Sequence, residues 1–137
     1  RNVPSITNVE GVGPFLARSG RPEAVEAVAR RFAEQSVDQR LKTLDQATEH
    51  PPETYAAQPE LRKAVIDLLL LGLRDNEVRA GMSIGWGDKT ITDPRVCDLA
   101  GDHLHDLDPA AFPFDLFAPY AQREQQRLAI LASIANP

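Results

Sequence analysis

The segment from Asp93 to Leu107 contains the pattern of a short amphipathic helix with a marked start. Asp93 is a residue type that caps free backbone N–H groups, and Pro94 suits the first helical position because it has no N–H to lose. Apolar residues follow at helical spacing at Val96, Leu99, Ala100, Leu104 and Leu107. The pattern predicts a helix over 94–107 that Asp93 caps.

The same combination of a start signal and an apolar stripe recurs along the chain. Proline marks predicted helix starts at Pro22, Pro59 and Pro119, and Ser36 with Gln39 has the spacing of a capping box. The helix from Pro59 carries apolar residues around most of its circumference, which is typical of a central helix. We therefore predict a helix after each of these signals.

Each predicted helix has a stripe that we expect to face the core. These inward residues are Val25, Val28 and Phe32; Val37, Leu41 and Leu44; Leu61, Val65, Leu68, Leu69 and Leu73; and, in the last helix, Tyr120, Leu128, Leu131 and Ile134.

The segments between the helices carry no strand pattern. Residues 1–8 are predicted to be irregular, 11–19 to form one or two helical turns, and 75–92 to form a glycine-rich loop. Trp86 in this loop either packs back onto the body, which we expect, or serves as a contact anchor. The aromatic connector 112–117 is expected to fill the core. The prediction is an all-α fold, an irregular bundle or short solenoid of about five to six helices.

Length and charge narrow the functional classes. The 137 residues predict a single helical domain spanning 1–137, and a start at Arg1 rather than Met leaves open a longer parent protein. A net charge of −5 argues against nucleic acid as a partner. We expect a soluble chain without membrane insertion, because it has no signal peptide and no apolar run near the ~20 residues that cross a bilayer. Compartment and oligomeric state stay open.

The single cysteine limits what sulfur chemistry the chain can support. Cys97 alone cannot form an intramolecular disulfide or a multi-cysteine zinc site. A nucleophilic role needs nearby positive charge, whereas the surrounding sequence is acidic. We therefore predict a buried structural cysteine.

The predicted helix over 94–107 carries a row of carboxylates. Asp98, Asp102 and Asp106 are spaced four apart and share the outer face with His105. His103 falls on the apolar face, too far around the helix to share an ion with His105, and is expected to bond backbone groups in the core. The acidic row either faces solvent, which we expect, or binds a basic partner or a weak oxygen-ligated ion.

Two blocks of the sequence resemble HEAT-repeat-type α-solenoid proteins. They are Gly13-Pro14-Phe15-Leu16-Ala17 before Glu23-Ala24-Val25, and Asp93-Pro94-Arg95-Val96-Cys97-Asp98-Leu99-Ala100, which is similar to the opening of a HEAT second helix. The charged helix from Tyr120 through Arg123, Glu124 and Arg127 is also similar to terminal helices that follow such repeats in bacterial proteins. The resemblance implies HEAT-like helix pairs and a scaffold or interaction role, with no catalytic residues.

Two functional hypotheses follow. The leading one is a non-enzymatic scaffold or protein-interaction module with a protein partner, no cofactor, and no catalytic or metal-binding residue. Its candidate binding surface comprises Trp86, Asp98, Asp102, His105 and Asp106. The alternative is a metal-dependent enzyme or accessory domain that uses the acidic helix 94–107.

Overall fold

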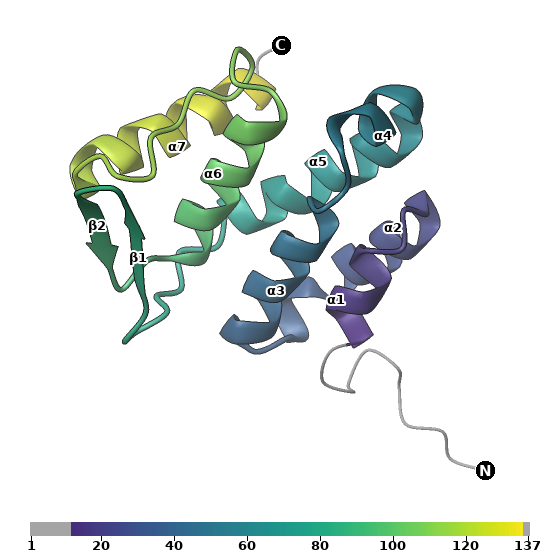
Figure 1. Cartoon of the computed structure of the whole chain (residues 1–137), viewed down its shortest axis with the longest axis horizontal. Coiled ribbons are helices and arrows are strands. Elements are labelled where there is room, and N and C mark those ends of the chain that lie inside the picture. The colour runs from purple at the N-terminus through teal and green to yellow at the C-terminus, as the bar shows by residue number, and fades with distance from the viewer. Residues whose placement is uncertain (1–11, 136–137) are drawn as a thin grey trace.

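The computed structural model describes residues 12–135, and 63% of it is helical. The predicted all-α class is therefore confirmed, while the prediction for residues 1–8 lies outside the described part. The helices are α1 (Val12–Ala17), α2 (Pro22–Arg30), α3 (Val37–Ala47), α4 (Pro52–Ala57), α5 (Pro59–Leu73), α6 (Val96–Leu107) and α7 (Tyr120–Ala135), with a 3₁₀ turn η2 (Phe32–Glu34). Figure 1 shows α1–α4 on one side of the molecule and α7 with a β-hairpin on the other.

Helix α5 is central, as its apolar circumference predicts. It packs against α2 on one side and α6 on another, and it also contacts α3 and α4 (Figure 1). Gly72 allows the closest of these approaches, because a Cβ there would lie 3.0 Å from the Cβ of Ala100 and 3.1 Å from Cδ1 of Leu44. The core therefore sits where α3, α5 and α6 meet.

Helix α3 begins where the sequence predicts. The Ser36 hydroxyl accepts a hydrogen bond from the Gln39 backbone N–H at 3.2 Å, which is the capping half of the predicted box. Past its C-terminal end, the Tyr55 hydroxyl of α4 donates to the Ala47 carbonyl oxygen at 2.7 Å. This bond satisfies a terminal carbonyl and holds the short α4 against α3.

Within the predicted loop 75–92, residues 83–92 form a β-hairpin, so the prediction is wrong there, whereas residues 75–82 contain no helix or named strand. Strands β1 (Ser83–Trp86) and β2 (Lys89–Thr92) pair antiparallel, with Trp86 opposite Lys89. Gly87 opens the two-residue turn with φ +64°, a conformation that glycine adopts without a steric penalty. Four-residue strands are too short to display a clear alternation, and only Ile91 is buried.

The Asp93 cap is a second correction. Helix α6 begins at Val96 with Arg95 as its N-cap residue, so Asp93 lies outside the helix. Asp93 instead adopts φ +50°, and its carboxylate accepts the Gly81 backbone N–H at 2.7 Å. The residue that looks like a helix cap therefore closes the base of the hairpin.

The first N–H groups of α6 bond to a distant part of the chain. The Val96 N–H donates to the Glu77 carbonyl at 2.9 Å, and the Cys97 N–H donates to the Asp75 carbonyl at 2.8 Å. The chain after α5 thus supplies acceptors that a side-chain cap would otherwise provide. No local sequence signal specifies such a tertiary cap.

The aromatic connector fills the core as predicted. Phe112, Phe114 and Leu116, in the connector that joins α6 to α7, are all buried. Phe114 packs on Gly101, where a Cβ would lie 2.7 Å from Cε1 of the ring. The connector therefore depends on a glycine in the middle of α6.

The expected inward face of α7 is wrong in most positions. Ile130 is its buried residue and Leu131 is half-buried, whereas Tyr120, Leu128 and Ile134 are exposed. The helix contacts the body through its arginines and Glu124 in the first half and through Ile130 and Leu131 in the second half, and the other three large apolar residues point outward.

Candidate interaction surface

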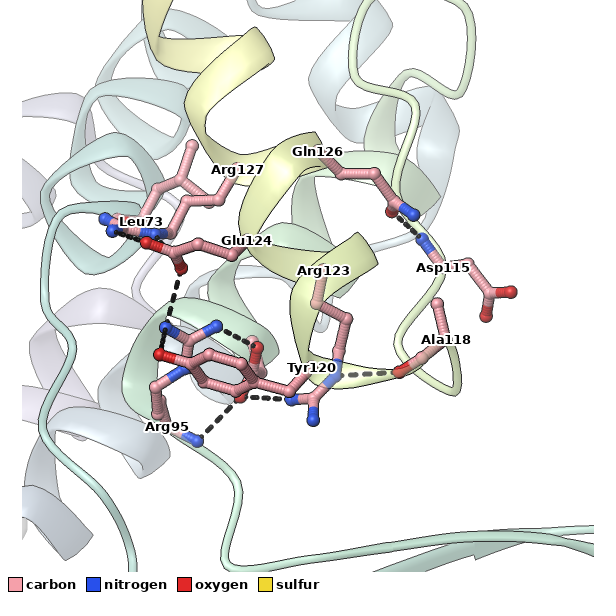
Figure 2. A network of polar contacts seen from close by, with 10 residues as sticks. Leu73, Arg95, Asp115, Ala118, Tyr120, Arg123, Glu124, Gln126 and Arg127 are labelled. Carbon is pink, nitrogen blue, oxygen red and sulfur yellow. Dashed lines mark hydrogen bonds and ion pairs between the residues drawn. The ribbon is translucent and has the colours of Figure 1, made fainter.

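A buried arginine–carboxylate network joins α6 to α7. It comprises Arg95, Asp98, Arg123, Glu124 and Arg127 (Figure 2). Asp98 and Arg95 come from the start of α6, and the other three come from the first half of α7.

Asp98 is the buried anion of this network, with an exposed fraction of 1%. Its Oδ2 accepts the Arg95 backbone N–H at 2.9 Å and pairs with Nη1 of Arg123 at 2.6 Å. Its Oδ1 pairs with Nη2 of Arg95 at 3.1 Å. The expectation that Asp98 faces solvent is therefore wrong, because α7 covers that side of α6.

Glu124 is the second anion and bridges two arginines. Its Oε1 accepts from Nη1 of Arg95 at 2.7 Å, and its Oε2 pairs with Nη2 of Arg127 at 2.6 Å. The hydrogen bonds from Arg127 and Arg95 lower the pKa of Glu124 to about 2. Arg127 also donates to the Leu73 carbonyl at 3.2 Å, which ties α7 to the end of α5 (Figure 2).

The network holds three guanidinium groups and two carboxylates, so one cation needs other partners. The Arg95 guanidinium carbon lies 4.5 Å from the centroid of the Tyr120 ring, a cation–π distance. Arg123 donates its Nε–H to the Ala118 carbonyl at 2.9 Å. These contacts give the guanidinium groups further polar and aromatic partners, and they help to fix α7 in place on α6 (Figure 2).

The remaining acidic residues continue the row from Asp98 along the same face of α6, four residues apart. Burial and then the charge of Asp106 raise the pKa of Asp102. Asp106 is exposed, and His105 donates its Nδ1–H to the Phe112 carbonyl at 3.0 Å. Asp102, His105 and Asp106 therefore form the accessible part of the row, whereas Asp98 is buried under α7 and Trp86 lies on the hairpin.

The surroundings of α6 limit its chemistry. Within residues 12–135, no three His, Cys, Asp or Glu side chains are placed to hold one metal ion. Cys97 is fully buried as predicted, and burial followed by the Asp98 charge raises the pKa of its thiol to about 11. Such a thiol is a poor nucleophile at neutral pH.

A cavity of about 410 Å³ lies between α4 and α6, where His103 contributes to the wall. Its lining residues are Thr48, His50, Pro52, Tyr55, Ala56, Arg62, His103, Asp106 and Leu107.

His103 bonds side chains there, and not the backbone groups expected. Its Nε2 lies 2.8 Å from Oδ1 of Asp45, and its Nδ1 lies 3.3 Å from the Thr48 hydroxyl. The order Thr–His–Asp resembles a nucleophile triad, but the Thr48 hydroxyl donates its one proton to backbone carbonyls such as that of Leu44, at 3.0 Å. The imidazole therefore has no hydroxyl proton to remove, and the contact joins α6 to α3.

The exposed apolar surface comes from the hairpin and α7. Trp86 is 77% exposed, Tyr120 59%, Leu128 52% and Ile134 37%. We call these four residues the exposed apolar set. Phe15 on α1, Leu71 on α5 and Val78 before the hairpin are exposed as well.

The second half of α7 has little polar character at all. Residues 128–135 include one polar side chain, and this Ser133 hydroxyl donates to the Ile130 carbonyl at 2.7 Å within the helix. An apolar helix end with one buried residue is a surface suited to another apolar surface.

Sequence reasoning missed most of this surface. It expected Trp86 to pack onto the body, but the two-residue turn carries Trp86 to the tip of the hairpin. It also expected Tyr120, Leu128 and Ile134 to face inward. The available signal was the arginine and glutamate spacing at the start of α7, which marks the stripe that docks on α6.

Comparisons with protein-family models, curated proteins and solved structures return no match for this chain. Among the described helices, none combines the length and the hydropathy needed to span a membrane.

Proposed function

We propose that this chain is a non-enzymatic helical interaction module, built of HEAT-like helix pairs, that binds a protein partner through the exposed apolar set. The observation that carries the proposal is Trp86, which is 77% exposed at the tip of a closed hairpin. Tryptophan is among the residues that most often dominate binding energy at protein interfaces.

The placement of the surface supports the same proposal. Hairpin and α7 lie on the same side of the molecule (Figure 1), and Arg95, just after the hairpin, stacks on Tyr120 at the start of α7. The buried arginine–carboxylate network fixes α7 on the start of α6, directly after the hairpin. A pre-organised surface binds with a smaller entropic cost than a flexible one.

The experiment compares three versions of the full chain as bait in the organism from which the sequence comes. The versions are wild type, Trp86→Ala, and Phe15→Ala as a matched control that removes an equally exposed aromatic from α1. Captured proteins are quantified, and any protein that the tryptophan variant loses is purified for calorimetry.

The proposal expects Trp86→Ala to weaken binding of that partner by about 30-fold or more, the loss typical of an interface hot spot. Phe15→Ala should bind as wild type does. If the wild type and Trp86→Ala capture the same proteins with the same affinity, the hairpin tip is not the contact surface and the proposal fails.

A further inference from the structure

A groove of about 370 Å³ lies between the C-terminal ends of α2 and α5. Its floor is apolar, built from Ala29, Phe32 and Ala33 on one side and Leu71 on the other. Phe32 is buried, whereas Leu71 is 39% exposed although α5 is the central helix. The exposed part of this apolar floor is therefore Leu71 with Ala33, whereas Phe32 is almost fully covered.

Two arginines line this groove without a carboxylate partner among the described residues. Arg30 is in the last turn of α2, and Arg74 follows the last turn of α5. Both are exposed, and Arg74 donates to the Leu70 carbonyl at 3.3 Å. The negative end of a helix dipole favours such residues, but its partial charge does not neutralise a full guanidinium charge.

The other charges of the groove are already paired. Arg40 forms ion pairs with both Asp75 and Glu77. Counting Arg30 and Arg74, the lining holds three arginines and two carboxylates. The groove is therefore a positive site on a chain whose net charge is −5.

We infer that this groove binds an acidic peptide segment of a partner protein, in which aspartate or glutamate alternates with leucine or phenylalanine. The carboxylates pair with Arg30 and Arg74, whose planar guanidinium groups can each bind a carboxylate through two hydrogen bonds. The apolar side chains cover Leu71 and the Phe32 side of the floor. A simple anion gains nothing from that floor, so the pairing of both features selects a peptide.

The probe is a blocked hexapeptide of alternating aspartate and leucine, titrated into the full chain by calorimetry. Two matched peptides replace every aspartate by asparagine or every leucine by alanine. Saturable binding of the first peptide, and weaker binding of both others, is the expected result. Added salt should weaken the interaction, because exposed charge pairs are screened.

Variants locate the binding. Arg30→Gln, Arg74→Gln and Leu71→Ala should each weaken the peptide about tenfold, the effect of losing a charged hydrogen bond or a buried leucine contact. Lys42→Ala is the matched control, since Lys42 is an exposed cation of α3 outside the groove. Far-UV circular dichroism and a urea melt confirm that each variant is folded.

Three outcomes overturn the inference: no saturable binding, equal binding of the asparagine or alanine peptide, or an equal loss in Lys42→Ala, which would indicate unspecific attraction. The groove and the exposed apolar set have no residue in common. If the peptide experiment fails, the proposed function at Trp86 is unaffected. If the Trp86→Ala experiment fails, the inference about the groove is unaffected.

Discussion

Asp98 is the residue whose environment decides how α7 is held. It is a carboxylate with two arginine partners and almost no exposure to solvent. Replacing such a buried ion pair by apolar residues can be neutral, but removing one partner leaves uncompensated charge. The residue is therefore structurally important without being a binding residue.

Asp98→Ala should lower the free energy of unfolding by about 3–5 kcal/mol, because Arg95 and Arg123 lose their shared anion. Asp106→Ala is the matched control, an exposed aspartate of the same helix, and should change stability by less than about 0.5 kcal/mol. Urea melts of both variants measure the difference. Equal effects would mean that Asp98 does not hold the network together.

Replacing Asp102, unlike replacing Asp98, should not destabilise the fold. Burial and Asp106 raise the pKa of Asp102, so the folded state disfavours its ionised form, and the group destabilises the fold above that pKa. We expect Asp102→Asn to be neutral or slightly stabilising at neutral pH. Calcium or zinc should shift the melting temperature of either protein only slightly.

Thermal melts with chelator, calcium and zinc make this test. A specific ion at a hundred times its dissociation constant would add about 2.7 kcal/mol. A metal-dependent gain that the Asp102→Asn variant loses would restore the hypothesis of a metal site on α6.

At the scale of elements, local sequence signals predicted the helices well. They gave wrong predictions where a distant segment of the chain determines how a residue is bonded or buried. Ser36 and Pro59 mark starts that the structure confirms, because capping and proline geometry act within a few residues. The prediction that Asp93 caps α6 is wrong because backbone carbonyls of the 75–77 segment accept the first N–H groups of the helix instead. The prediction that Asp98 faces solvent is wrong because α7, which comes later in the chain, covers it.

The candidate surface was predicted only in part for the same reason. Trp86 belongs to it, but the sequence could not indicate that a short hairpin would carry the side chain outward. The inward and outward faces of α7 depend on which stripe meets α6. The leucine and isoleucine positions of α7 predict that an apolar stripe faces the body. In the structure, the arginines and Glu124 of the buried network face α6 instead.

The contact between α6 and the aromatic connector depends on Gly101. A methyl group there would lie 2.7 Å from Phe114, so Gly101→Ala should cost about 1–3 kcal/mol of stability as the ring moves. Gly85→Ala is the matched control, because its Cβ would meet its neighbours at 3.7 Å, an ordinary contact. Chemical denaturation of both variants tests the contrast. Equal stability would show that the connector repacks freely.

At the scale of the whole molecule, the network makes the free energy of unfolding decrease at acidic pH. The pKa of Glu124 is about 2 in the folded state, below its ordinary value of 4.5. A lowered carboxyl pKa contributes stability that is complete above about 4.5 and is lost as the pH falls toward 2. The docking of α7 should therefore weaken across this window.

The difference between wild type and Glu124→Gln isolates this effect from the other carboxyls. The wild type should be more stable by about 2 kcal/mol at neutral pH, and the gap should close between pH 4.5 and 2. Denaturant melts at several pH values follow the gap. A gap that stays constant with pH would mean that Glu124 titrates normally.

The central claim, that the hairpin tip and α7 form the contact surface, is tested most directly by the fluorescence of Trp86, which is the only tryptophan in the chain. In the free protein, its emission should be that of a water-exposed indole, readily quenched by iodide, and Phe15→Ala should leave it unchanged. Adding the purified partner should shift the emission to shorter wavelength and protect Trp86 from iodide, in step with binding measured by calorimetry. Binding with no change in emission or quenching would contradict the account, because the partner would then contact a different surface.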